Sequence, residues 1–366
     1  MKKIFYFMHV DWNWIKQRPH FLSEGLSKYF DIEVRYERNF IHNKRLTYNQ
    51  KKETEHLKIR SIKRLPFNRF YIIYILNSII SKMFLWRSTR NADFIWVPSP
   101  LYFPYYKKRK NQIVVYDCMD NMLGFNQKKS LKRRIEKYEK RLVKQADIII
   151  STSEYLRDIL VNRYNLKKNI HVINNAIFTD DSSSELVLPQ SIQICFENNT
   201  FFKIVYIGTI AEWFDFDLLI SSVKQNEKIK YFLFGPCEID IPKHPQIEIV
   251  GPIEHKYIYP VMQQADCLIM PFIINELIRS VNPVKAYEYI YAHKPVIMPH
   301  YGESEKFADY IYLYDTPQKY HAFITKLVNQ YLTPKNSYEA HKKYALQNTW
   351  DCRIAEIRKI LVNNNS

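Results

Sequence analysis

The feature that most constrains this chain is an alternation of short apolar runs with charged segments of helical length. In the first half we expect strands at residues 3–9, 32–36, 93–97, 113–117, 147–151 and 170–173, and helices at 17–29, 69–86, 129–145 and 153–163. Short apolar strands that alternate with helices predict βαβ units, in which a parallel sheet is covered by helices on both faces.

A second alternation follows the first. We expect strands at residues 203–207, 230–234, 247–250, 266–270, 295–298 and 311–314, and helices at 215–225, 255–264, 283–292, 317–331, 337–347 and 350–362. The polar, aperiodic stretch 179–200 between the two halves predicts a linker. The predicted fold class is therefore α/β, with two doubly wound parallel-sheet domains at 1–178 and 201–348 that face each other across a cleft. Such a cleft suits an enzyme that joins two substrates.

Cysteine content and hydropathy indicate a cytoplasmic protein. The five cysteines are widely spaced and include no CxxC pair, which argues against a disulfide framework or a zinc site. The apolar run of MKKIFYFMHVDW is short and has no small-residue cleavage site after it, so we expect a buried first strand and no signal peptide. No stretch reaches the about 18–20 apolar residues that a membrane-spanning helix requires.

The net charge of +17 is unevenly distributed. Residues 1–180 carry +20 and residues 181–366 carry −3, so a polyanionic partner is expected at the first half. Residues 41–90 hold 12 Lys and Arg and two Glu around the run YIIYILNSIISKMFLW, and further basic clusters lie at 107–110 and 128–144. Basic and aromatic residues around an apolar helix are typical of helices that lie on an anionic membrane surface. For any one cluster, a solvated helix remains the alternative.

Only six glycines occur, and Gly208, Gly235 and Gly251 each follow a predicted strand of the second half. Ligands of open parallel sheets sit outside the carboxyl ends of the strands, where the backbone must turn sharply. Tight turns alone would also explain each glycine. Neither half contains GxGxxG or GxxxxGK[ST], so a dinucleotide redox site and a P-loop are not expected.

The segment 268–298, LIMPFIINELIRSVNPVKAYEYIYAHKPVIM, predicts an anion site. Pro283 is expected near the start of a helix, where free amides and the helix dipole favour a diphosphate. Lys285 adds a positive charge in the first turn, and Glu288 shares its face of the helix. A carboxylate can accept both hydroxyl protons of a vicinal diol. A Lys–Glu pair with no ligand is the alternative.

This segment resembles the nucleotide-sugar segment of GT-B glycosyltransferases, in which NPxKxxEY precedes xxKPVI. In those enzymes the glutamate that matches Glu288 bonds the ribose hydroxyls. The loop 206–219 resembles the phosphate-side turn of the same family, although it has no basic residue, and Ser280 stands where many retaining relatives have a second glutamate. The resemblance implies these donor-binding residues: Gly208, Thr209, Gly235, Arg279, Ser280, Asn282, Pro283, Val284, Lys285 and Glu288. It also implies that the C-terminal helix, within 349–366, crosses back to the first domain.

The first half contains a second group of candidates. W…QRPH within residues 9–26 and YDxxDxxxxF within 114–125 resemble stretches of GT-B enzymes that make teichuronic acids and capsules. Aromatic faces stack on sugar rings, so the acceptor-binding candidates are Trp12, Trp14, Gln17, Arg18 and His20. His9, Asp11 and Asp120 are the alternative catalytic bases for an acceptor hydroxyl, and Asp117 is an expected cap.

The resemblance implies transfer of a sugar, with a hexose and a UDP donor favoured, to a lipid-linked or growing saccharide in bacterial surface polysaccharide synthesis. We expect helix amides and Lys285 to stabilise the leaving diphosphate, so no metal and no cofactor are expected. The partners would be the nucleotide sugar, the saccharide acceptor and the inner face of the plasma membrane, with no nucleic acid. The alternatives are a non-catalytic GT-B accessory subunit and a basic nucleic-acid-binding protein.

Overall fold

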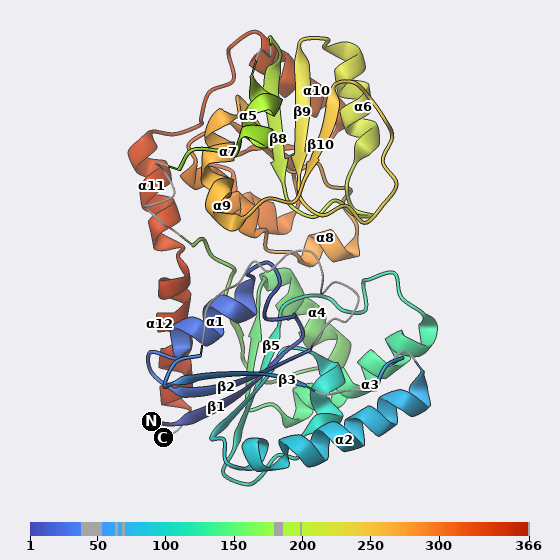
Figure 1. The fold of residues 1–366 in the computed structure, drawn as a ribbon, viewed down its shortest axis with the longest axis vertical. Helices are drawn as coiled ribbons and strands as arrows, with labels where there is room; N and C mark the ends of the chain where they lie inside the picture. The colour runs from blue at the N-terminus through green and yellow to red at the C-terminus, as the bar shows by residue number, and fades with distance from the viewer. Residues whose placement is uncertain (38–52, 63–64, 68–69, 179–185, 198–199, 365–366) are drawn as a thin grey trace. The chain divides into compact units, whose positions relative to one another are not determined.

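The computed structural model describes residues 1–37, 53–62, 65–67, 70–178, 186–197 and 200–364 (Figure 1). The chain divides into two compact units, which we call unit 1 (Met1–Asn174 and Arg353–Ser366) and unit 2 (Asn175–Cys352). Each unit is built around one parallel sheet. Within the described residues, no helix is long and apolar enough to cross a membrane.

Unit 1 contains a seven-stranded parallel sheet in the order β3-β2-β1-β4-β5-β6-β7. Its strands are β1 (Lys3–Met8), β2 (Asp31–Glu37), β3 (Leu57–Ile62), β4 (Phe94–Val97), β5 (Ile113–Cys118), β6 (Ile148–Ser151) and β7 (Ile170–Val172). Six of these strands match the sequence prediction, and β3 was not expected. β3 lies at the sheet edge, and only its first and last residues are buried, so it lacks the apolar run of a central strand.

Helices cover both faces of the unit 1 sheet. They are α1 (Arg18–Leu26), α2 (Tyr71–Arg90), α3 (Lys129–Gln145), α4 (Glu154–Tyr164), α12 (Trp350–Asn363) and the 3₁₀ helix η1 (Pro100–Tyr105). α2, α3 and α4 share one apolar core with the sheet. α1 and α12 pack together, and a Cβ atom at Gly25 would lie 1.9 Å from Cδ1 of Ile354. A side chain at position 25 would therefore require the side chain of Ile354 to move.

Unit 2 contains a six-stranded parallel sheet in the order β10-β9-β8-β11-β12-β13. Its strands are β8 (Phe202–Ile207), β9 (Ile229–Phe234), β10 (Ile247–Gly251), β11 (Cys267–Ile269), β12 (Val296–Pro299) and β13 (Tyr312–Tyr314). All six match the predicted positions. With unit 1, they confirm the α/β fold class of two doubly wound parallel sheets.

The helical elements of unit 2 also cover both faces of its sheet. They are α5 (Gln190–Phe196), α6 (Phe216–Gln225), α7 (Ile258–Gln264), α8 (Glu276–Ser280), α9 (Val284–Tyr291), α10 (Pro317–Val328), α11 (Tyr338–Gln347) and the 3₁₀ helices η3 (His255–Tyr257) and η4 (Gly302–Phe307). α5, α7 and α9 contribute to one apolar cluster, and α6 and α10 contribute to another. Parallel strands buried in this way on both faces explain the continuous apolar runs of the sequence.

The stretch 179–200, expected to be a linker, contains a helix. Residues 179–185 and 198–199 lie outside the described part of the chain. The remainder includes α5, whose Ile192 and Phe196 are buried in the core of unit 2. Two buried apolar side chains therefore anchor a segment whose polar composition predicted a linker.

Two glycines meet where β8 and β9 end. The N–H of Gly208 donates to the carbonyl of Phe234 at 2.8 Å, and the N–H of Gly235 donates to that of Gly251 at 2.9 Å. Gly235 has φ +142°, and a Cβ atom there would lie 1.9 Å from the carbonyl oxygen of Gly208. This edge of the sheet therefore requires glycine for both backbone conformation and space.

We predict that Gly235→Ala destabilises unit 2 by about 3 kcal/mol or more, because strained backbone and overpacking each cost about 1–3 kcal/mol. Urea unfolding measures the change in the free energy of unfolding. Gly302→Ala is the matched control, since a Cβ atom at Gly302 meets no atom within 4 Å. Equal unfolding midpoints for the two variants would contradict the requirement for glycine at position 235.

Candidate functional site

Strand order reverses between β1 and β4 in unit 1, and between β8 and β11 in unit 2. In open α/β sheets, ligands bind outside the carboxyl ends of the strands at such reversals. The candidates in unit 1 follow β1 and β5, and those in unit 2 follow β8, β9 and β11. Both sets of predicted residues therefore lie at the edge where a ligand is expected.

The edge of unit 1 is organised by a buried ion pair. Arg18 is 5% exposed and Asp117 is fully buried, with Nη2 and Oδ1 3.1 Å apart. Arg18 Nη1 also donates to the carbonyl of Ile173 at 2.9 Å, and the indole N–H of Trp96 donates to Asp117 Oδ2 at 3.3 Å. These contacts use the polar atoms of Arg18 inside the unit. Its side chain, expected to bind the acceptor, holds the loops around the site together.

His20 and Trp12, two further acceptor candidates, are also internal. His20 Nδ1 accepts from the N–H of Gln17 at 3.1 Å, and Nε2 lies 3.2 Å from the carbonyl of Trp12. Burial lowers the pKa of His20 to about 4, so the ring is neutral at pH 7 and Nε2–H donates to that carbonyl. Trp12 is 4% exposed and its ring centroid lies 5.2 Å from that of His20. These contacts fix the course of the loop.

The remaining candidates of this loop reach its surface. His9 and Gln17 are exposed, and Trp14 is partly exposed. Asp11 is also partly exposed, and its Oδ1 accepts from the N–H of Asn13 at 3.0 Å, as in a turn closed by an aspartate side chain. Surface contact with an acceptor is therefore open to Trp14 and Gln17.

Asp120 has the most perturbed carboxyl group of this edge. Burial raises its pKa to about 6, with a smaller contribution from the negative charge of Asp117, although the positive charge of Arg18 opposes the shift. The residue is partly exposed in the turn after β5. A carboxyl group that titrates near neutral pH can hold or release a proton under physiological conditions. Asp120 thus differs from Asp117, whose oxygens are committed to Arg18 and Trp96.

In unit 2, the predicted donor residues fall into two groups. Gly208, Gly235 and Thr209 form the turns after β8 and β9, where the hydroxyl of Tyr206 donates to the carbonyl of Thr209 at 2.8 Å. The others surround the start of α9, with Pro283 just before Val284. Arg279 is exposed at the end of α8. The hydroxyl of Ser280 is buried and donates to the carbonyl of Leu277 at 2.6 Å, so it is used within its own helix.

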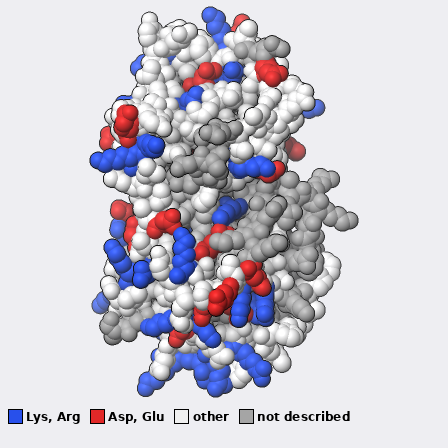
Figure 2. All heavy atoms as spheres, turned by 60° about the vertical axis from the view of Figure 1, so that its left-hand side comes forward, with Lys and Arg blue, Asp and Glu red and all other residues white. Residues whose placement is uncertain are grey.

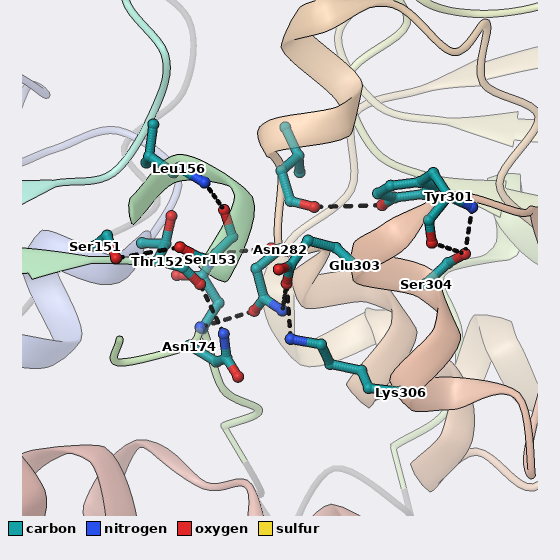
Figure 3. A network of polar contacts seen from close by, with 12 residues as sticks. Ser151, Thr152, Ser153, Leu156, Asn174, Asn282, Tyr301, Glu303, Ser304 and Lys306 are labelled. Carbon is teal, nitrogen blue, oxygen red and sulfur yellow. Dashed lines mark hydrogen bonds and ion pairs between the residues drawn. The ribbon is translucent and has the colours of Figure 1, made fainter. Parts of the chain in front are cut away.

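Asn282 belongs to a buried polar network (Figure 3). Its Oδ1 accepts from the N–H of Asn175 at 2.8 Å, and its Nδ2 lies 3.4 Å from Glu303 Oε2. Glu303 in turn pairs with Lys306 at 2.7 Å. No sequence pattern indicated Glu303 and Lys306, because their partner Asn282 lies about one helix and one strand earlier in the chain. This network positions the loop that leads into α9.

Lys285 and Glu288 form an ion pair, with Nζ and Oε2 2.5 Å apart. Their side chains are 25% and 10% exposed. Glu288 also lines a pocket with Phe178, His255, Tyr259 and Tyr291. The pocket residues other than Glu288 were not predicted. Phe178, His255 and Tyr259 come from segments far from Glu288 in sequence, whereas Tyr291 lies three residues later on the same helix. The pocket joins one carboxylate to several aromatic walls, a combination that suits a planar ring attached to a polyol.

Within the described residues, no group of three or more His, Cys, Asp or Glu side chains is arranged to hold a metal ion. Lys256 lines the candidate donor pocket, and Lys285 pairs with its Glu288, so two positively charged side chains lie near the pocket.

Comparison with known proteins gives three related findings. Residues 41–181 match the family model described as Glycosyltransferase Family 4. A teichuronic acid biosynthesis glycosyltransferase of Bacillus subtilis (strain 168), TuaH, is 23% identical over 269 residues, which is 67% of this chain and 66% of that relative. The chain therefore spans just under two thirds of the curated relative that it matches.

Solved structures share the complete fold. Sucrose-phosphate synthase from Thermosynechococcus elongatus has a TM-score of 0.74 at 11% identity, with 99% of both chains covered. HepE of Anabaena, solved in complex with UDP-glucose, has a TM-score of 0.65 at 14% identity, with 99% of this chain and all of that chain covered. Taken with the two doubly wound sheets, these similarities show that the chain has the GT-B fold, and the matches to Glycosyltransferase Family 4 and to TuaH make it similar to bacterial glycosyltransferases.

Proposed function

We propose that this chain transfers a hexose from a UDP-sugar to a hydroxyl of a lipid-linked or growing saccharide in bacterial surface polysaccharide synthesis. The reaction takes place in the cytoplasm, at the inner face of the plasma membrane. The observation that carries the proposal is the pocket of unit 2 that contains Glu288 beside the start of α9. The names of two similar proteins, TuaH and the UDP-glucose complex of HepE, support the reaction class and the donor.

The pocket is suited to the nucleoside part of the donor. Glu288 pairs with Lys285, and a carboxylate accepts both hydroxyl protons of the ribose diol. Phe178, Tyr259 and Tyr291 provide aromatic surface for the base. Hydrogen bonds to a charged acceptor each contribute about 1.5–3 kcal/mol, so Glu288 makes a large share of nucleoside affinity.

The ion pair between Lys285 and Glu288 changes the expected roles of both residues. In the absence of ligand each neutralises the other at 2.5 Å. When the ribose hydroxyls donate to Glu288, Lys285 is released to approach the diphosphate. The free N–H groups in the first turn of α9 add further donors to the same phosphate oxygens. Binding of the two parts of the donor is thereby coupled through one side-chain exchange.

The chemistry requires one proton acceptor and a stabilised leaving group. The acceptor oxygen forms a bond to the anomeric carbon, and the bond from that carbon to the diphosphate oxygen breaks. The hydroxyl proton passes to Asp120, whose raised pKa suits a general base near neutral pH. The departing UDP carries the negative charge, which Lys285 and the α9 amides stabilise without a metal ion. His9 and Asp11 are the alternative bases.

We predict that Glu288→Gln lowers the affinity for both UDP and uridine by about 10–100-fold, through loss of hydrogen bonds to a charged acceptor. Lys285→Met should weaken UDP by about tenfold and leave uridine unchanged, because only UDP carries phosphate charge. Isothermal titration calorimetry with UDP, uridine, GDP and CMP measures these affinities. Addition of EDTA should not change them.

Glu248→Gln is the matched control for this titration. Glu248 pairs with Lys230 at 2.7 Å in the same unit and does not line the pocket. The Glu248→Gln variant should therefore bind UDP with wild-type affinity. Equal UDP binding by wild type and Glu288→Gln would remove Glu288 from the donor site. A wild-type chain that binds no nucleotide would instead favour the non-catalytic accessory subunit.

We further predict that kcat/KM rises about tenfold per pH unit below pH 6 and becomes constant above about pH 7, because a general base must be deprotonated. Asp120→Asn should abolish this rise and lower kcat by about 10²–10⁴-fold.

The pKa of Asp120 is raised from 3.8 to about 6, so its charge destabilises the folded state above that pH. The same variant should therefore gain about 1–2 kcal/mol of stability at pH 7.5 and none at pH 4.

Initial rates over pH 4.5–9 and urea unfolding at the two pH values provide separate readouts. Asp11→Asn and His9→Gln are the comparison variants. A pH profile that is retained in Asp120→Asn but lost in one of these would reassign the base to the other residue.

A further inference from the structure

Helix α2 packs onto unit 1 through a mostly polar face and leaves an apolar face exposed. Its buried residues are Tyr74, Asn77, Ser78, Ser81, Leu85 and Thr89. Its exposed face carries Ile72, Ile75, Leu76, Ile79, Met83 and Trp86, with exposures from 37% to 74%. We call these six residues the α2 apolar stripe. Apart from the adjacent Ile75 and Leu76, they recur at intervals of three and four residues, so they lie along one side of the helix.

The buried polar side chains are held by hydrogen bonds. The side-chain amide of Asn77 accepts from the N–H of Leu65 at 2.7 Å and donates to its carbonyl at 3.1 Å. The hydroxyl of Tyr74 donates to the carbonyl of Leu101 at 3.1 Å, and Thr89 donates to the carbonyl of Leu85 at 2.9 Å. These hydrogen bonds therefore determine the orientation of α2. Because the polar face makes them inside unit 1, the apolar stripe faces outward.

A basic pocket adjoins the end of the stripe. It is lined by Lys82, Trp86, Arg90, Lys107, Lys108 and Arg109, together with Thr89 and Tyr106. No carboxylate occurs among these lining residues, although Lys108 is paired with Asp147 at 2.5 Å. Trp86 belongs to both features, and the guanidinium of Arg90 lies 4.9 Å from its ring centroid. Figure 2 shows Lys and Arg side chains gathered over the lower end of the view, which belongs to unit 1.

We propose that the α2 apolar stripe and the basic pocket form one docking surface for an anionic lipid bilayer. The stripe enters the boundary between headgroups and acyl chains, and lipid phosphates occupy the pocket. Interfacial helices combine an apolar face with cations in this way. Large contiguous apolar patches on a protein surface mark interaction sites.

Charge selects the bilayer over a second copy of the chain. A twofold dimer through α2 would place the same surface of each copy in contact, and so bring two basic pockets toward each other. Residues 1–180 already carry a net charge of +20, so that contact would be repulsive. An anionic bilayer satisfies the apolar and the basic parts of the surface together.

This inference deepens the proposed function, because it brings a lipid-linked acceptor and the enzyme to one surface. Its test needs neither donor nor acceptor. Co-sedimentation of the full chain with vesicles of phosphatidylcholine, and of phosphatidylcholine mixed with phosphatidylglycerol, measures the partition coefficient. Calorimetry with UDP on the same variants keeps the two proposals separate, since docking variants should bind UDP as the wild type does.

We predict that the wild type prefers the anionic vesicles. Lys107→Gln with Arg109→Gln should lower this binding about 25-fold at low salt, about fivefold for each cation, and high salt should have the same effect. Ile79→Ser with Met83→Ser should lower it at least about tenfold, through lost apolar contact. All four positions are exposed, so the fold should tolerate the changes.

Two matched pairs serve as controls. Val187→Ser with Ile194→Ser removes apolar side chains that are 77% and 60% exposed in unit 2, and Lys342→Gln with Lys343→Gln removes exposed cations there. Both should retain wild-type partitioning. Equal binding to both vesicle types, or equal losses in test and control pairs, would overturn the proposal. Light scattering that shows a dimer lost in Ile79→Ser with Met83→Ser, with vesicle binding unchanged, would assign the surface to a second copy.

Discussion

The ion pair between Arg18 and Asp117 determines the shape of the unit 1 edge, because it joins segments that no strand pairing connects. Arg18 lies at the start of α1, Asp117 near the end of β5, and the carbonyls of Ile173 and Asn174 follow β7. Trp96 adds β4 through its indole N–H. Removal of one partner from a buried pair leaves an uncompensated charge and costs about 3–5 kcal/mol. The loops that carry the candidate base and acceptor residues are therefore positioned by one interaction, whose atoms are not available to a substrate.

The pair between Lys285 and Glu288 in unit 2 has the opposite character. Both side chains keep contact with solvent, at 25% and 10% exposure, and they are only three residues apart on one helix. Because Lys285 is partly exposed, this pair is easier for a ligand to separate than a pair with both partners buried. Arg18 and Asp117 are only 5% and 0% exposed and cannot exchange in the same way. Burial thus separates the two pairs into one that supports the fold and one that can respond to a ligand.

The sequence predicted what depends on local pattern. Of the thirteen strands in the described part of the chain, twelve were expected because strands buried on both faces are continuous apolar runs, and the exception, β3, is an edge strand with a polar middle. The start of α9 and its Lys285–Glu288 pair followed from proline and helical spacing. The aromatic pocket could not be predicted, because Phe178 and His255 approach Glu288 only through the fold. The burial of Arg18 was missed for the same reason, since Asp117 is 99 residues away in sequence.

Helix α2 shows where local pattern fails for a different reason. Its sequence is apolar on nearly every side, so periodicity does not say which face is buried. The choice is made by Asn77 and Tyr74, which find backbone partners at Leu65 and Leu101 inside the unit. Burying a polar group without a hydrogen-bond partner costs more free energy than leaving an apolar side chain in water. Exposed apolar surface costs only about 25 cal/mol per Å². The hydrogen bonds therefore decide the orientation, and the apolar stripe remains as surface that becomes favourable only when something covers it.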